Sequence, residues 1–251
     1  MHGRGIFRAF DAKKVTADLI AWLQHTFEES GPGCNAVLGI SGGKDSTVVA
    51  ALCAKALGKE RVIGVLLPNG TQQDIEDSRA VVKQLGIQSY ELNIKQPFDA
   101  ILQELSTHTA PSEQTRINLA PRLRMAVLYA VSQSFNGRVV NTSNLSEAWV
   151  GYSTRYGDSA GDFAPLLHLT AHEVKAIGHE LGLPDYLVEK TPSDGLSGKS
   201  DEAKLGFTYQ TLDTYIRTGV CPDASVKKRI DTLHKANRFK QLPMPSFEYK
   251  N

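Results

Sequence analysis

The sequence predicts an α/β fold built on a doubly wound parallel sheet with helices on both faces. Four short segments between residues 36 and 141 are expected to be strands, and each of the first three is followed by a segment expected to be a helix. A glycine- and serine-rich turn joins the first strand to the helix after it, and such a turn is typical of α/β proteins that bind an anion at the helix N-terminus. Strands that alternate with helices form parallel sheets and bind ligands at the carboxyl ends of the strands.

The expected elements follow in a regular order along the chain. Asp11 is placed to cap an amphipathic helix over residues 11–29, and Gly31-Pro32-Gly33 ends it. The expected strands are residues 36–40, 62–67, 88–93 and 138–141. The helices expected between them are residues 48–57, 75–85, 100–105 and 122–135. Pro121 falls near the start of the last helix, where proline is tolerated.

The pattern changes after the fourth strand. Residues 142–166 are rich in Gly, Ser, Tyr and Asp and have no clear period, and they are too long for an idle connection. Thr170 and Glu173 form a capping box. The helices expected in this part are residues 171–181, 208–218 and 224–236. No linker separates a second unit, so we expect a single domain over residues 1–251.

Residues 39–47 hold the most informative motif, Gly-Ile-Ser-Gly-Gly-Lys-Asp-Ser-Thr. Unhindered backbone N–H groups and the positive end of a helix meet at this turn, and both favour an anion. The motif is not a Walker loop, because only three residues separate Gly39 from Gly43. Lys44 is followed by Asp45, where a Walker loop has Ser or Thr. The Gly-x-Gly-x-x-Gly spacing of dinucleotide-binding loops is also absent.

Asp45 indicates a metal ion at this loop. A carboxylate about 4 Å from a phosphate oxygen costs roughly 4 kcal/mol of repulsion at an effective dielectric constant of about 20. It is tolerated where a divalent cation lies between the two charges, as Mg²⁺ does at nucleotide phosphates. The segment 41–46, Ser-Gly-Gly-Lys-Asp-Ser, resembles the pyrophosphate loop of the N-type ATP pyrophosphatases. Enzymes of that superfamily adenylylate a substrate and release pyrophosphate.

Composition narrows the class of protein. A net charge of +1 over 251 residues provides no overall attraction to nucleic acid or to an anionic membrane. No apolar run approaches the roughly 18 residues of a membrane span, and residues 1–5 lack a signal-peptide core. Cys34, Cys53 and Cys221 are widely spaced, which favours a reducing compartment and argues against a zinc site. We therefore expect a cytoplasmic protein that binds neither nucleic acid nor membrane.

Three further segments make the resemblance more specific. Residues 142–147 and 151–158 resemble the ammonia-dependent NAD synthetases, and residues 67–74 match the loop after the second strand in that family. Tyr-Gly-Asp at residues 156–158 is the most diagnostic sequence, because other ATP pyrophosphatases lack it. The resemblance runs from about residue 15 to 245, and it implies the Rossmann-like, adenine nucleotide alpha hydrolase-like fold.

The family's activity implies a reaction for this chain. ATP drives the amidation of deamido-NAD (nicotinic acid adenine dinucleotide) with ammonia to NAD, through an adenylate intermediate, with release of AMP and pyrophosphate. Residues 1–38 are too few for a glutaminase domain before the loop, which agrees with ammonia as the nitrogen donor. The resemblance also implies Mg²⁺ as cofactor, ATP as co-substrate, small molecules as the other partners, and a homodimer.

The resemblance assigns roles to individual residues. The catalytic set is Lys44, Asp45 and Asp158, and the metal-binding set is Asp45 and Glu147. The ATP-binding set is Gly39, Ile40, Ser41, Gly42, Gly43, Lys44, Asp45, Ser46, Thr142 and Ser193. The deamido-NAD-binding set is Arg122, Arg155, Asp158 and Asp162. Guanidinium groups suit the diphosphate and the carboxylate of this substrate.

The chain departs from the family pattern at a few positions. Lys44 stands where many members have Gln, and the added charge favours phosphate. Ala171 stands where others carry a lysine that contacts ATP, and either Lys175 or Lys190 can substitute for it. Near the end of the chain, the pair at 238–239 is Arg-Phe instead of His-Lys, so the dinucleotide contact of that pair stays unassigned.

Two alternatives stay open. Another N-type ATP pyrophosphatase, either an adenylylating amidase or a tRNA-modifying enzyme, would share residues 39–47, but it should show paired cysteines or a basic RNA-binding face. The chain has one basic cluster near its end, which consists of Lys227, Lys228, Arg229, Lys235 and Arg238. A solvated helix face explains this cluster more simply than an RNA-binding face does. The second alternative is a non-catalytic nucleotide sensor, which the presence of both Asp45 and Glu147 disfavours.

Overall fold

The structure, a computed structural model, describes residues 10–72, 74–190 and 201–249. Its sheet has four parallel strands in the order β3-β2-β1-β4. The strands are β1 Asn35–Gly39, β2 Val62–Leu66, β3 Gln88–Glu91 and β4 Gly137–Val139. Their ends lie within two residues of the expected ones. The predicted doubly wound parallel sheet is confirmed.

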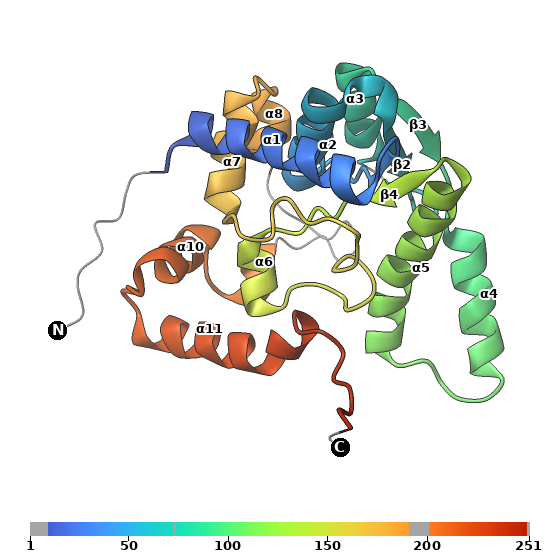
Figure 1. The fold of residues 1–251 in the computed structure, drawn as a ribbon. Helices are drawn as coiled ribbons and strands as arrows, with labels where there is room; N and C mark the ends of the chain where they lie inside the picture. The colour runs from blue at the N-terminus through green and yellow to red at the C-terminus, as the bar shows by residue number, and fades with distance from the viewer. Residues whose placement is uncertain (1–9, 73, 191–200, 250–251) are drawn as a thin grey trace.

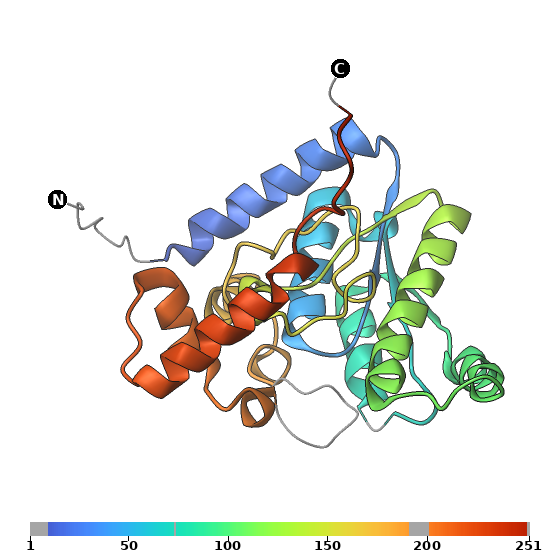
Figure 2. The ribbon, with the colours of Figure 1, turned by 90° about the horizontal axis from the view of Figure 1, so that it is seen from below.

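Helices cover both faces of this sheet, as Figure 1 and Figure 2 show. One face carries α1 Ala12–Ser30, α2 Lys44–Leu57, α3 Ile75–Leu85 and α7 Ala171–Glu180, and the other carries α4 Lys95–Ser106 and α5 Glu113–Ser134. Strand β1 explains the two layers, because successive side chains of a strand point to opposite faces. Ala36 and Leu38 lie in the first core and Val37 in the second. The strand therefore reads as a continuous apolar run.

Helices α6 Leu145–Val150, α9 Asp201–Leu205, α10 Tyr209–Thr218 and α11 Ala224–Asn237 lie together. Helix α8 Asp185–Val188 instead belongs to the first core, beside α2 and α7. The short turn η1 Lys59–Arg61 links α2 to β2, and η2 Arg238–Lys240 follows α11. A third apolar cluster, which includes Leu212 and Ile230, joins α6, α10 and α11. The segment between α6 and α7 lies between α11 and α5 in both views. None of the helices in the described ranges is long and apolar enough to cross a membrane.

Helix α5 corrects the sequence-based prediction. It begins at Glu113 with Ser112 as its N-cap, and Pro121 lies inside it instead of near its start. An interior proline costs a helix about 3 kcal/mol. Here the proline also contacts the Tyr-Gly-Asp loop, since a Cβ added at Gly157 would lie 2.9 Å from Pro121 Cβ. Glycine at 157 therefore permits the loop to pack closely on the helix.

Candidate active site

The phosphate loop, residues 39–47, begins at the last residue of β1, at the carboxyl edge of the sheet, and runs into the first turn of α2. The chain continues from β1 to β2 on one side, whereas β4 pairs with β1 on the other. Such a reversal of strand order is where doubly wound sheets bind ligands. Helix α2 begins at Lys44, earlier than the expected residue 48. The first N–H groups of α2 therefore belong to the motif itself and can bind an anion.

Hydrogen bonds inside the loop fix its shape. Ser46 Oγ and Thr47 Oγ1 donate to the Gly43 carbonyl at 3.1 and 2.8 Å. Ser41 Oγ accepts from the Gly43 N–H at 3.3 Å and lies 3.2 Å from Ser46 Oγ. Three hydroxyl groups of the motif thus hold the loop before any ligand arrives. Ser193, the other serine expected at the ATP site, lies outside the described residues.

Gly42 forms the apex of the loop and rests on α3. Its φ is +76°, a conformation that residues with a Cβ rarely adopt. An added Cβ would also lie 2.8 Å from Asp77 Cβ and 2.9 Å from the backbone nitrogen of Ser78. Both the backbone conformation and the lack of space therefore require glycine. The close contact places the first turn of α3 directly beside the phosphate loop.

Asp45 is held between a cation and an amide. Its Oδ2 lies 2.7 Å from Lys44 Nζ, and the Lys44 side chain is only 2% exposed. Its Oδ1 accepts a hydrogen bond from Asn144 Nδ2 at 3.1 Å. Asn144 is the N-cap of α6 and forms a capping box with Glu147. The connection from β4 to α6 thus brings Glu147 beside the phosphate loop, next to Asp45.

The charges of Lys44, Asp45 and Glu147 do not balance. The pKa of Glu147 is raised to about 8, chiefly by desolvation and next by the charge of Asp45, while Lys44 opposes the shift. Burial alone would lower the pKa of Lys44, but the carboxylates of Asp45 and Glu147 raise it overall. Two carboxylates thus face one ammonium group. Within the described residues, no group of three or more His, Cys, Asp or Glu side chains is placed to hold a metal ion.

The Tyr-Gly-Asp loop folds back onto the end of β4. Asn141 Nδ2 and Ser143 Oγ donate to the Asp158 carbonyl at 2.8 and 3.1 Å, on either side of the half-buried Thr142. The Thr154 N–H donates to Asp158 Oδ1 at 2.9 Å. Desolvation raises the pKa of Asp158, although hydrogen bonds from Thr154 oppose the shift. A raised pKa makes a carboxylate a stronger base, although the Asp158 residue is exposed to solvent.

The two arginines of the expected deamido-NAD site lie together. Arg122, which is exposed on α5, donates from Nε to the Arg155 carbonyl at 3.3 Å. Arg155 donates to the Leu242 carbonyl at 3.3 Å, and its guanidinium lies 5.0 Å from the ring centre of Tyr156 and 5.6 Å from that of Phe239. These contacts leave donors on both guanidinium groups for a ligand.

The Asp162 carboxylate accepts hydrogen bonds from two other groups of the protein. Its Oδ2 accepts from the Val139 N–H at 2.8 Å, and its Oδ1 accepts from the Tyr129 hydroxyl at 3.3 Å. These bonds tie the loop to β4 and α5. The sequence places Asp162 among the substrate-binding residues. In the structure it supports the loop, and its exposed carboxylate keeps acceptor sites for a ligand.

The structure shows which of the two lysines could replace the family lysine that is missing at Ala171. Ala171 is buried in the third apolar cluster. Lys175 Nζ pairs with Glu189 at 2.8 Å. Lys190 Nζ pairs with Asp77 at 2.6 Å, so it lies beside the residue that contacts Gly42. Of the two lysines, Lys190 is the one near the phosphate loop.

Sequence reasoning missed three residues at this site. Asn144 could have been found from its capping-box spacing to Glu147. Arg124 is half-buried and donates from Nε to the Leu67 carbonyl at 3.0 Å. Desolvation lowers its pKa, which the charge of Asp158 partly offsets. The third is Tyr209. Its ring centre lies 5.9 Å from Lys44 Nζ, a contact that no local pattern predicts.

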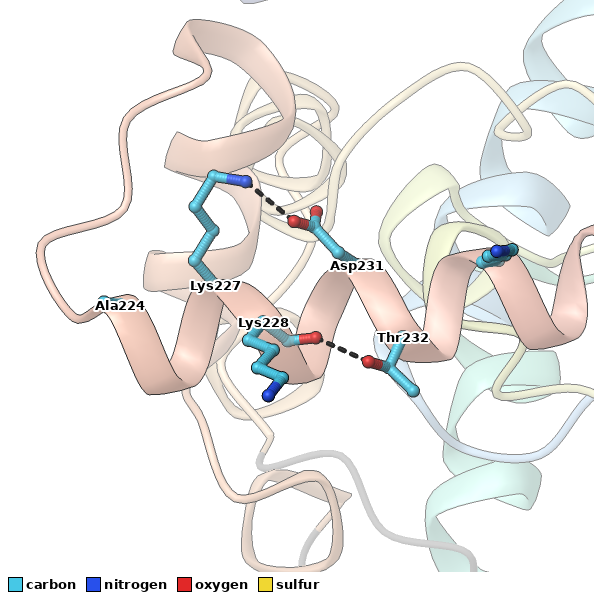
Figure 3. Close-up of a pocket in the computed structure, with 6 residues that line it drawn as sticks. Ala224, Lys227, Lys228, Asp231 and Thr232 are labelled. Atoms are coloured by element: carbon cyan, nitrogen blue, oxygen red, sulfur yellow. Dashed lines mark hydrogen bonds and ion pairs between the residues drawn. The ribbon is translucent and has the colours of Figure 1, made fainter.

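The basic cluster near the end of the chain lies apart from these residues. A hollow on α11, shown in Figure 3, is lined by Ala224, Lys227, Lys228, Asp231, Thr232 and Lys235. Lys227 Nζ pairs with Asp231 at 2.7 Å. All six lining residues belong to one helix, which agrees with the interpretation of a solvated helix face.

Comparison with known proteins identifies the family. The family described as NAD synthase matches residues 15–244. The NH(3)-dependent NAD(+) synthetase of Thermococcus sibiricus is 39% identical over 243 residues, which cover 96% of this chain and 92% of that protein.

Two solved structures resemble the fold over 96% of this chain and 100% of theirs. They are NMN synthetase from Francisella tularensis, with a TM-score of 0.88 and 32% identity, and NH3-dependent NAD synthetase from Campylobacter jejuni, with 0.78 and 29%. The resemblance predicted from the sequence is confirmed. The chain belongs to the NAD synthase family.

Proposed function

We propose that this chain joins ammonia to the nicotinate carboxylate of deamido-NAD at the expense of ATP, giving NAD, AMP and pyrophosphate. The observation that carries the proposal is the hydrogen bond between Asn144 and Asp45, which joins the phosphate loop to the start of α6 within an NAD synthase chain. The relative from Thermococcus sibiricus, an NH(3)-dependent NAD(+) synthetase, supports the choice of nitrogen donor.

The ATP site is the phosphate loop. In our proposal the amides of residues 39–46, Thr142 and Ser193 bind the nucleotide, and Lys44 adds a positive charge beneath the phosphates. Asp45 and Glu147 would hold Mg²⁺. Two carboxylates with too little positive charge between them fit this ion, which binds through one or two carboxylates and substrate phosphates. Bound Mg²⁺ neutralises charge on the phosphates.

The reaction runs in two steps. A carboxylate oxygen of deamido-NAD attacks the α-phosphorus of ATP, and the bond to pyrophosphate breaks. Ammonia then attacks the carbonyl carbon of the resulting acyl-adenylate, and AMP leaves with the carboxylate oxygen. Asp158 accepts a proton from the attacking nitrogen, a role supported by its raised pKa. Alignment of the two substrates supplies much of the acceleration.

The deamido-NAD site includes Arg122 and Arg155, whose guanidinium groups bind the diphosphate or the carboxylate of the substrate. Asp158 follows Arg155 by three residues in the same loop, and Asp162 ties that loop to β4. We further propose one catalytic domain, a homodimer as in the family it resembles, and a cytoplasmic location. The location is supported by three free cysteines, Cys34, Cys53 and Cys221.

A second candidate function is the amidation of the corresponding mononucleotide. It is favoured by the NMN synthetase from Francisella tularensis, whose TM-score of 0.88 exceeds the 0.78 of the Campylobacter NAD synthetase. The mononucleotide carries the same nicotinate carboxylate, so the phosphate loop would perform the same chemistry. The two candidates differ only in the adenylate half of the substrate.

A direct assay separates the two candidates. Purified protein with Mg-ATP and ammonium is given deamido-NAD or nicotinate mononucleotide, and NAD or NMN is measured. We expect kcat/KM for deamido-NAD to be at least about tenfold higher, equivalent to about 1.4 kcal/mol. The reverse preference would make the mononucleotide the substrate, and no product from either would contradict both. Glutamine in place of ammonium should give no product.

A further inference from the structure

The hydroxyl group of Tyr209 has no hydrogen-bond partner among the described residues, although the residue is only 5% exposed. Burying an unpaired hydroxyl costs about 1–3 kcal/mol, and folded proteins contain few such groups. Phenylalanine would fill nearly the same volume without this cost. The hydroxyl therefore requires an explanation beyond packing of the free chain.

The ring of Tyr209 is well accounted for by packing. It lies in the third apolar cluster with Ala171, Leu205, Phe207 and Leu212. The backbone N–H of Tyr209 donates to Glu202 Oε1 at 2.7 Å, at the start of α10. Packing thus explains the aromatic ring and the position of the residue, and only the oxygen atom lacks a role.

The oxygen belongs to the environment of the phosphate loop. Lys44 Nζ lies 5.9 Å from the ring centre, and Lys44 is the first residue of α2. The carboxylates of Glu147, Asp201 and Asp45 all act on the phenol, with Glu147 the strongest of the three. Tyr209 therefore stands where the phosphate loop meets the start of α6, which is where the phosphates and the metal ion are assigned.

A neutral phenol in this place can donate one hydrogen bond. The acceptors that ligand binding brings to the loop are phosphate oxygens, and hydrogen bonds to charged acceptors are about twice as strong as those between neutral groups. We propose that the Tyr209 hydroxyl donates a hydrogen bond to a phosphate oxygen of the bound nucleotide, which makes Tyr209 part of the ATP site. This inference rests on the proposed use of the phosphate loop for ATP.

The test compares two tyrosines of one helix. Tyr209→Phe removes the hydroxyl in question. The matched control is Tyr215→Phe on α10, because the Tyr215 hydroxyl donates to Asp231 at 2.6 Å on an exposed surface. Thermal unfolding is measured without ligand, and the dissociation constant of ATP is measured calorimetrically with Mg²⁺ and without deamido-NAD. Both measurements are independent of turnover.

We expect Tyr209→Phe to unfold at the same temperature as the unsubstituted protein or higher, and to bind ATP about tenfold more weakly or worse. Tyr215→Phe should bind ATP normally. ATP binding by Tyr209→Phe within about twofold of normal would overturn the inference, as would a clear loss of thermal stability, since the hydroxyl would then be paired in the free protein. If the unsubstituted protein does not bind ATP, the proposed function fails as well.

Discussion

The phosphate loop and the Tyr-Gly-Asp loop lie at the same edge of the sheet, but their side chains are held differently. Ser41 and Ser46 are bonded within the loop, and Asp45 contacts both Lys44 and Asn144. At the other loop, Arg122 is exposed and contacts a backbone carbonyl. Tyr156, beneath the Arg155 guanidinium, is 60% exposed.

The difference matters for the function proposed above. The phosphate loop, the proposed ATP end, is already shaped in the free chain, so changes there should reduce kcat. The two arginines, at the proposed dinucleotide end, lie nearer the surface, so changes there should raise KM for deamido-NAD with less effect on kcat. The following substitutions test this contrast.

Asp45→Asn should have the largest effect. It removes a carboxylate assigned to the metal and leaves the buried Lys44 ammonium without its partner at 2.7 Å. We expect kcat to fall more than about tenfold, a loss above roughly 1.4 kcal/mol. We also expect a lower unfolding temperature, because a buried charge loses its partner. Steady-state kinetics giving more than about a tenth of normal kcat would remove Asp45 from the metal role.

Glu147→Gln should separate catalysis from stability. The raised pKa of Glu147, about 8 against 4.5 for an ordinary glutamate, means that the folded chain keeps a proton that the unfolded chain releases. The stability of the metal-free protein should therefore fall as pH rises from about 4.5 to about 8. The glutamine side chain cannot ionise, so the variant should lose this dependence while kcat falls about tenfold or more.

Thermal unfolding between pH 5 and pH 9 in the presence of a chelator checks the stability part of this prediction. The same preparation, returned to Mg²⁺, is used for kinetics. If the variant kept the pH dependence of the unsubstituted protein, another group would be responsible. If it also kept normal kcat, the role of Glu147 at the metal would be wrong.

The sequence predicts the sheet well and displays the phosphate-loop motif for a physical reason. Buried parallel strands read as apolar runs, and the phosphate loop is one contiguous motif, so both are visible locally. The start of α5 at Glu113 was not predictable in this way, because Pro121 normally marks a helix start. Tyr209 and Lys44 meet only through the packing of α10, which local periodicity cannot show.

Lys190→Ala tests whether the ATP end extends to α3. Lys190 neutralises Asp77, which lies directly beside Gly42, so its loss leaves a carboxylate near the phosphates. We expect KM for ATP to rise about tenfold, a change equivalent to roughly 1.4 kcal/mol. Lys175→Ala is the control, because Lys175 pairs with Glu189 instead. Equal values of KM for the two variants would remove Lys190 from the site.

Arg122→Ala should have the smallest effect. The side chain is exposed, so its interactions are screened by water and salt. We expect KM for deamido-NAD to rise about threefold to tenfold with little change in kcat. Arg116→Ala, an exposed arginine on the same helix, should change neither. A fall in kcat with constant KM would show that this end of the site is as preorganised as the phosphate loop.

Isotope transfer tests the central claim, adenylation of the substrate at the phosphate loop, most directly. Deamido-NAD labelled with ¹⁸O in its nicotinate carboxylate is turned over with Mg-ATP and ammonium, and the masses of the products are measured by mass spectrometry. Because a carboxylate oxygen attacks the α-phosphorus and leaves when ammonia displaces the adenylate, AMP should carry one labelled oxygen and pyrophosphate none. ADP among the products, or AMP without the label, would contradict the account.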